Sequence, residues 1–285
     1  YRSSTHMHTT LRLGISTCPN DTFAFDALLR GCIDTGNLKF EIELLDIQQL
    51  NDGLLEERFD VAKGSFHTAV LLSDKVSVLP SGSALGFGVG PLLLASQANT
   101  TPHDGSQTTL CPGELTTATL LLRLFYPQTT KIDHVVFSDI MPRLAAHQAD
   151  FGVCIHEGRF TWQQEGLHLV EDLGTRWERE TNCPLPLGGI FASKRLPVDT
   201  ANKVQSLIRQ SLELALANPS DALPTMRKYA QEFSDEVLMQ HVDLYVNDWT
   251  LDLGETGEQA LASLSRLAAS AGITPTGLAP LSVLR

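Results

Sequence analysis

Short apolar runs alternate with segments of helical spacing through the first two thirds of the chain. Residues 11–15, 38–45 and 60–65 have the length and apolar character of strands, and a segment with helical periodicity follows each of them. This βαβαβ order is typical of parallel strands that are joined by right-handed crossovers.

A second run of the same kind follows further along the chain. It predicts strands at 107–111, 132–137 and 150–155, with helices at 115–125 and 138–147 between them. From about residue 200 the pattern is helical, with amphipathic segments at 201–217, from Ser234 onward, and at 256–271.

The two runs predict an α/β protein with two lobes. A polar stretch at 99–105 and a returning strand at 190–193 indicate where the chain crosses between them. We assign residues 8–98 and 194–285 to a larger α/β lobe and residues 99–193 to a smaller one, which carries His156.

His156 follows the predicted strand at 150–155 directly. Ligands of α/β proteins bind beyond strand ends, and imidazole is well suited to proton transfer near neutral pH. A histidine at this position is more often a polar strand end, so the strand alone favours a structural role.

Other polar residues follow the predicted strands or begin helices. Ser16 and Asn20 lie in the polar turn at 16–22, where Asp21 or Thr22 is expected to cap the next helix. Free backbone N–H groups at such a turn favour an anion, although an ordinary capped turn explains it equally well.

Ser65 ends the third strand, and Thr116 and Thr117 begin the helix at 115–125. These positions suit a ligand carboxylate or hydroxyl group, although capping alone also explains the threonines. His241, Tyr245 and Trp249 share one helical face at intervals of four, a pattern more typical of packing than of a site.

Composition narrows the classes of function. The formal net charge of −12 argues against a nucleic-acid partner, and five cysteines without CxxC spacing argue against disulfides or structural zinc. There is no Walker, HExxH or GxSxG motif, and no apolar run reaches the ~18 residues of a membrane span. Residues 1–6 lack the apolar region of a signal peptide. We therefore predict a cytoplasmic protein, away from membranes, that binds a small polar or anionic molecule without a cofactor or metal.

Four segments resemble, in sequence and in order, those of the 1,4-dihydroxy-6-naphthoate synthases of the futalosine route to menaquinone. They are Ser-Thr-Cys-Pro-Asn-Asp-Thr-Phe (16–23), Gly-Ser-Ala-Leu-Gly-Phe-Gly-Val-Gly-Pro (82–91), Ile-His-Glu-Gly-Arg-Phe (155–160) and Pro-Leu-Pro-Leu-Gly (184–188). The resemblance extends from about Leu11 to the final helix.

This resemblance implies a two-lobed fold similar to the second class of periplasmic binding proteins, with mixed sheets and two hinge crossovers. It implies a carbon–carbon lyase that forms 1,4-dihydroxy-6-naphthoate from cyclic dehypoxanthinyl futalosine, a carboxylate substrate, with His156 as the general base. We expect the substrate to be held by Ser16, Asn20, Ser65, Thr116, Thr117 and Ile155.

Two other functions remain open on the same scaffold. One is a solute-binding protein without catalysis, and the other is the chorismate dehydratase of the same pathway. A homodimer is also left open.

Overall fold

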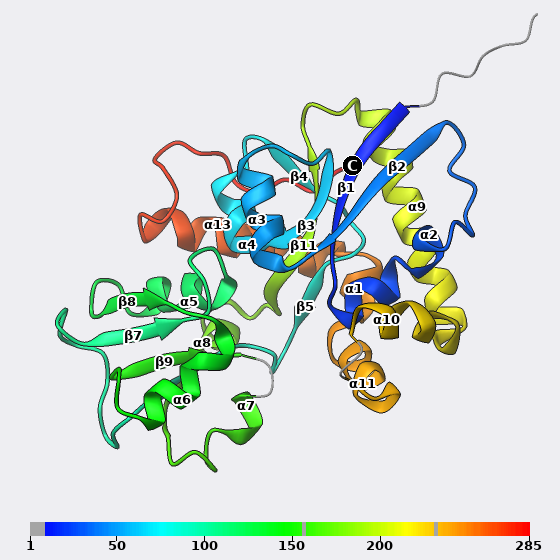
Figure 1. Ribbon diagram of the computed structural model, residues 1–285. Helices are drawn as coiled ribbons and strands as arrows, with labels where there is room; N and C mark the ends of the chain where they lie inside the picture. The colour runs from blue at the N-terminus through cyan, green and yellow to red at the C-terminus, as the bar shows by residue number, and fades with distance from the viewer. Residues whose placement is uncertain (1–8, 156–157, 231–232) are drawn as a thin grey trace, which may run out of the picture.

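The computed structural model describes residues 9–155, 158–230 and 233–285, and their strands form two sheets (Figure 1). The strand order of the first sheet is β2 (Leu38–Leu45), β1 (Thr9–Ser16), β3 (Val61–Ser65), β11 (Leu185–Ser193) and β4 (Val76–Val78), with β5 (Ala84–Gly86) paired to β11. The order of the second sheet is β10 (His168–Asp172), β6 (Leu92–Ala95), β9 (Phe151–Cys154), β7 (Thr108–Cys111) and β8 (Lys131–His134).

Both sheets are mixed, as expected. In the first sheet β1 runs parallel to β2 and β3, whereas β11 is antiparallel to β3, β4 and β5. In the second sheet β7 is parallel to β8 and β9, whereas β6 is antiparallel to β9 and β10. The parallel parts correspond to the two predicted βαβαβ runs, and the antiparallel strands come from the segments that connect the lobes.

The chain crosses to the second sheet between β5 and β6 and returns between β10 and β11. Leu173 N donates to Pro91 O at 3.0 Å, and a Cβ on Gly90 would overlap the Cα of Gly174, so the two crossovers touch. Strand pairing places residues 92–95 in the second sheet and residues 185–193 in the first. The domain boundaries at 98–99 and 193–194 stay a prediction.

Helices flank both sheets (Figure 1). Those of the first lobe are α1 (Pro19–Ala24), α2 (Asp26–Leu29), α3 (Ile47–Leu55), α4 (Phe66–Leu71), α9 (Val198–Ala217), α10 (Leu223–Tyr229), α11 (Asp235–Tyr245), α12 (Asp248–Leu251) and α13 (Gly254–Ser270), with the 3₁₀ turn η2 (Pro219–Ala222). Those of the second lobe are α5 (Thr117–Phe125), α6 (Ile140–Ala145), α7 (Gly158–Thr161) and α8 (Leu173–Thr181), with η1 (Phe137–Asp139).

One apolar core continues from the first lobe into the second. Phe66 and Phe191 pack edge to face at 5.5 Å in the first lobe, and the same cluster includes Leu93, Phe151 and Trp177 of the second lobe. Large apolar side chains stabilise a fold by about 1.5–3 kcal/mol each when fully buried. The shared core therefore holds the lobes together.

Two predicted boundaries differ from the structure. The first helix begins at Pro19 rather than at residue 23, because proline suits the first turn of a helix, and its N-cap is Cys18, with neither Asp21 nor Thr22 capping it. The Pro-rich segment before residue 190 belongs to β11, where a register shift between Pro186 and Gly188 accommodates the proline.

Candidate functional site

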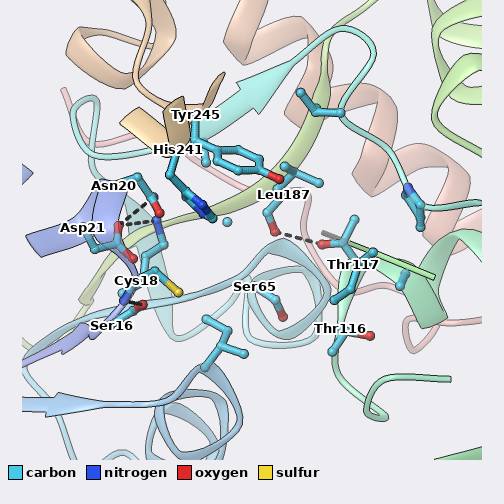
Figure 2. Close-up of a pocket in the computed structure, with 18 residues that line it drawn as sticks. Ser16, Cys18, Asn20, Asp21, Ser65, Thr116, Thr117, Leu187, His241 and Tyr245 are labelled. Carbon is cyan, nitrogen blue, oxygen red and sulfur yellow. Dashed lines mark hydrogen bonds and ion pairs between the residues drawn. The ribbon is translucent and has the colours of Figure 1, made fainter. Parts of the chain in front are cut away.

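A pocket of about 200 Å³ lies between the two lobes (Figure 2). The ends of β1 and β3, the start of α1 and one face of α11 line it from the first lobe, and the start of α5 lines it from the second. Its lining residues are Ser16, Cys18, Asn20, Asp21, Ile47, Lys63, Ser65, Ala84, Val89, Pro91, Thr116, Thr117, Ala118, Ile155, Leu187, Gly188, His241 and Tyr245.

The structure brings together all six residues that were expected to hold the substrate. They come from four separate segments of both lobes and line this one pocket: Ser16, Asn20, Ser65, Thr116, Thr117 and Ile155. The shared location follows from the topology, because β1 and β3 run parallel and end at the same edge of the first sheet. Contact of these residues with a substrate stays a prediction.

The predicted base, His156, lies outside the described residues, as does Glu157. The residue before it, Ile155, directly follows β9 and lines the pocket. On the other side of this gap, Arg159 donates to Gly90 O and pairs with Asp172, with Nη2 and Oδ2 3.1 Å apart. Arg159 therefore connects α7 to both crossovers.

A buried ion pair forms part of the pocket wall. Lys63 Nζ lies 2.7 Å from Asp21 Oδ1, and the side chains are only 6% and 5% exposed. Asn20 Nδ2 donates to the same oxygen at 3.3 Å. Gly188 leaves room for the lysine, since a Cβ there would lie 3.3 Å from Lys63 Cε. The carboxylate of Asp21 offsets the charge of Lys63, which allows an ammonium group at a buried strand end.

The hydroxyl groups of three candidate residues already donate hydrogen bonds within the protein. Ser65 Oγ donates to Leu115 O, and Thr117 Oγ1 donates to Leu187 O at 2.8 Å, so both bonds join one lobe to the other. Thr116 Oγ1 donates to Gly113 O at 2.9 Å and caps α5. With their protons committed in this way, these oxygens can accept hydrogen bonds from a ligand.

His67 is a buried histidine behind the pocket wall. Its Nδ1 lies 3.0 Å from the carbonyl oxygen of Thr116, so Nδ1 carries the proton and donates. Burial lowers the pKa of His67 to about 4, against the opposing effect of the hydrogen bond to Thr116. The imidazole is therefore neutral at pH 7 and holds the first turn of α5 against the first lobe.

Cys18 lines the pocket beside the ion pair. Burial raises the pKa of its thiol, and the nearby carboxylate of Asp21 raises it further. A protonated thiol is a poor nucleophile, so this arrangement does not favour covalent catalysis by Cys18.

Sequence reasoning missed His241 and Tyr245 as pocket residues. Both lie on α11 and project into the pocket (Figure 2), with ring centroids 4.8 Å apart. The predicted face shared with Trp249 is wrong, because α11 ends at Tyr245 and Asn247 caps a new helix, α12. Trp249 packs instead on Phe87, with ring centroids 5.8 Å apart.

Within residues 9–155, 158–230 and 233–285, no three His, Cys, Asp or Glu side chains cluster as metal ligands would. None of the helices in these ranges combines the length and the apolar character that crossing a bilayer requires.

The two-lobed arrangement is that of the periplasmic binding proteins. The periplasmic aliphatic sulphonate binding protein of Escherichia coli has a similar fold, with a TM-score of 0.60 and 12% identity over 96% of this chain and 93% of that one. At such low identity the likeness shows the fold alone.

Sequence comparison defines the family. A family model described as menaquinone biosynthesis matches residues 11–270, and the chain belongs to this family. It is 41% identical to the 1,4-dihydroxy-6-naphthoate synthase of Thermus thermophilus over 96% of this chain and 99% of that protein. It is 37% identical to the Streptomyces coelicolor enzyme of the same name, over 93% and 95%. A crystal structure from Archaeoglobus fulgidus has a TM-score of 0.82 and 30% identity, over 95% of this chain and 99% of that one. The resemblance found in the four sequence segments is therefore confirmed.

Proposed function

We propose that this protein is a 1,4-dihydroxy-6-naphthoate synthase, a carbon–carbon lyase that acts on cyclic dehypoxanthinyl futalosine. The observation that carries the proposal is the near-full-length similarity to two enzymes of that name, at 41% and 37% identity. The pocket adds support, because the six residues expected to hold the substrate line it together.

The lining of the pocket suits such a substrate. One end is polar, with Asn20 and the pair of Lys63 and Asp21, and can meet hydroxyl groups. Aliphatic side chains such as Val89 and Leu187 line other parts and suit a carbocyclic ring system. A ligand bound between the lobes would be shielded from water when the lobes close.

In the proposed mechanism His156 acts as a general base. It removes a proton from a hydroxyl group of the spirocyclic substrate, and the carbon–carbon bond breaks in a retro-aldol-like step. The deprotonated oxygen forms a C=O bond on the sugar-derived fragment as it leaves, and the electron pair of the broken carbon–carbon bond moves into the ring system, which becomes aromatic. A positioned base typically contributes ~10²–10⁴-fold to the rate. The position of Ile155 in the pocket wall supports this role for the residue that follows it.

One alternative is a solute-binding protein without catalysis. Binding proteins share this scaffold, and a fold does not by itself determine a function. Incubation of the purified protein with cyclic dehypoxanthinyl futalosine distinguishes the two. We expect 1,4-dihydroxy-6-naphthoate to appear in the absorbance spectrum and at the expected mass.

Chorismate is the parallel substrate in the same assay. Saturable binding without turnover of either compound would favour the solute-binding protein, and turnover of chorismate alone would favour the dehydratase. A cytoplasmic location and a homodimer stay predictions, and size-exclusion chromatography with light scattering tests the latter.

A further inference from the structure

Helix α11 presents two neighbouring faces to different surroundings. Leu238 and Val242 are 0% and 5% exposed and belong to the apolar core of the first lobe. His241 and Tyr245 are also four residues apart, but they are half-buried and line the pocket. Leu238 and Val242 thus pack α11 against the core. Core packing therefore does not account for the two rings that face the pocket.

The end of α11 is fixed beside the pocket. Asn247 Nδ2 donates to Leu85 O on β5 at 2.8 Å, and Thr250 Oγ1 donates to Tyr245 O at 3.1 Å. Ala84, the neighbour of Leu85, lines the same pocket. These bonds hold the backbone at Tyr245 in place, so the position of its ring does not depend on a ligand to order the helix.

The two rings form what we call the aromatic wall, which consists of His241 and Tyr245. Their planes are inclined at 43°, with centroids 4.8 Å apart. Figure 2 shows both rings entering the pocket from the side opposite Ser65. Among the described lining residues, His241 and Tyr245 carry aromatic rings, and the others are aliphatic or polar.

We propose that the aromatic wall receives the ring system of the ligand and selects a planar aromatic carboxylate over an aliphatic one. This inference rests on the proposed function, which supplies a ligand whose ring becomes aromatic. Because the rings are inclined, a planar ligand can stack on one of them and meet the other edge to face. Both geometries are favourable for aromatic pairs at centroid separations of about 4.5–7 Å.

Two probes test the wall without turnover. 2-Naphthoate has a planar aromatic ring system, and cyclohexanecarboxylate has the same charged group on a saturated ring. Their dissociation constants are measured by isothermal titration calorimetry for the wild type, Tyr245→Leu, Tyr245→Phe and Tyr229→Leu. Tyr229 lies on α10 and is not part of the pocket lining, which makes it a matched control.

We expect Tyr245→Leu to weaken 2-naphthoate binding by about 3- to 10-fold and to change cyclohexanecarboxylate binding less than about 2-fold. Tyr245→Phe should restore 2-naphthoate binding, and Tyr229→Leu should bind both probes as the wild type does. Equal losses for both probes, or a wild type that does not bind 2-naphthoate, would overturn the proposal. Circular dichroism and thermal unfolding verify that each variant is folded.

The turnover assay keeps the two proposals separate. If the wild type does not convert cyclic dehypoxanthinyl futalosine, the proposed function fails, whereas the probe comparison still decides for or against an aromatic wall. If it does convert it, Tyr245→Leu should raise KM by a similar factor and leave kcat within about 2-fold, as expected for a residue that binds the ring in ground and transition states alike.

Discussion

Lys63 and Asp21 form a buried ion pair in the wall of the pocket, with Nζ and Oδ1 2.7 Å apart. They are 42 residues apart in sequence and meet because β1, which leads into α1, lies beside β3 in the sheet. A charge buried at a strand end is stable only while its partner remains. A substitution of either residue therefore changes both the wall of the pocket and the stability of the first lobe.

Removal of one partner should destabilise the protein strongly. We expect Lys63→Met to lower the free energy of unfolding by about 3–5 kcal/mol, because Asp21 would be left buried and unpaired. The double variant Lys63→Met/Asp21→Leu should recover a large part of this loss. Urea unfolding followed by circular dichroism measures both.

The matched control is Lys75→Met, since Lys75 pairs with Glu57 where the side chains are 50% and 40% exposed. Its effect should stay below about 1 kcal/mol. Similar losses for Lys63→Met and Lys75→Met would show that burial does not set the contribution of the Lys63 pair.

His67 should make the protein less stable in mild acid. Its pKa of about 4 in the folded protein lies below the ordinary value of about 6.5, mainly because of burial. The charges of Arg123 and His134 lower the pKa further, whereas the hydrogen bond to Thr116 and the charge of Glu114 raise it. Between these two pH values the unfolded chain binds a proton at this residue and the folded protein does not. The contribution of His67 is therefore constant above about pH 6.5 and falls, by about 3 kcal/mol at most, as the pH drops to 4.

His67→Asn tests this pH dependence, because an amide can still donate to the carbonyl oxygen of Thr116 but does not titrate. The unfolding free energy of the variant should decline less than that of the wild type between pH 6.5 and pH 4. His103→Asn, at an exposed position, should keep the wild-type profile. Parallel profiles for the wild type and His67→Asn would contradict the assignment.

The contact between the two crossovers leaves no space for a side chain at Gly90. An added Cβ would overlap the backbone of Gly174, so Gly90→Ala must separate the crossovers. We expect a loss of about 1–3 kcal/mol in unfolding free energy, as for other overpacked buried sites. Gly105→Ala is the control, since nothing lies within 4 Å of a Cβ there. Equal unfolding midpoints for the two variants would show that the crossovers can separate at no cost.

Local patterns were sufficient to predict much of the pocket. Ser16 and Ser65 were found because they end apolar runs, and Thr116 because a polar residue precedes a helical segment. The parallel order of β1 and β3 then explains why these separate segments meet. These features depend on neighbours in sequence and on a general rule of sheet topology.

The features that sequence did not reveal depend on distant partners. Lys63 lies near the end of the strand predicted at 60–65, but no local pattern indicates that Asp21, 42 residues away in sequence, faces it. The helical stripe of His241 and Tyr245 had the correct period, yet the period does not say whether a core or a pocket lies opposite. Pairing with β5 likewise extends β11 into a Pro-rich segment that has no strand pattern of its own.

The proposed mechanism makes His156 the general base of this pocket. The most direct test is the single-turnover conversion of cyclic dehypoxanthinyl futalosine by the wild type and by His156→Asn, followed as formation of 1,4-dihydroxy-6-naphthoate. We expect conversion by the wild type and a rate lower by ~10²–10⁴-fold in the variant, with an unchanged unfolding midpoint and unchanged 2-naphthoate binding. A folded His156→Asn variant that converts the substrate at a near-wild-type rate would contradict it.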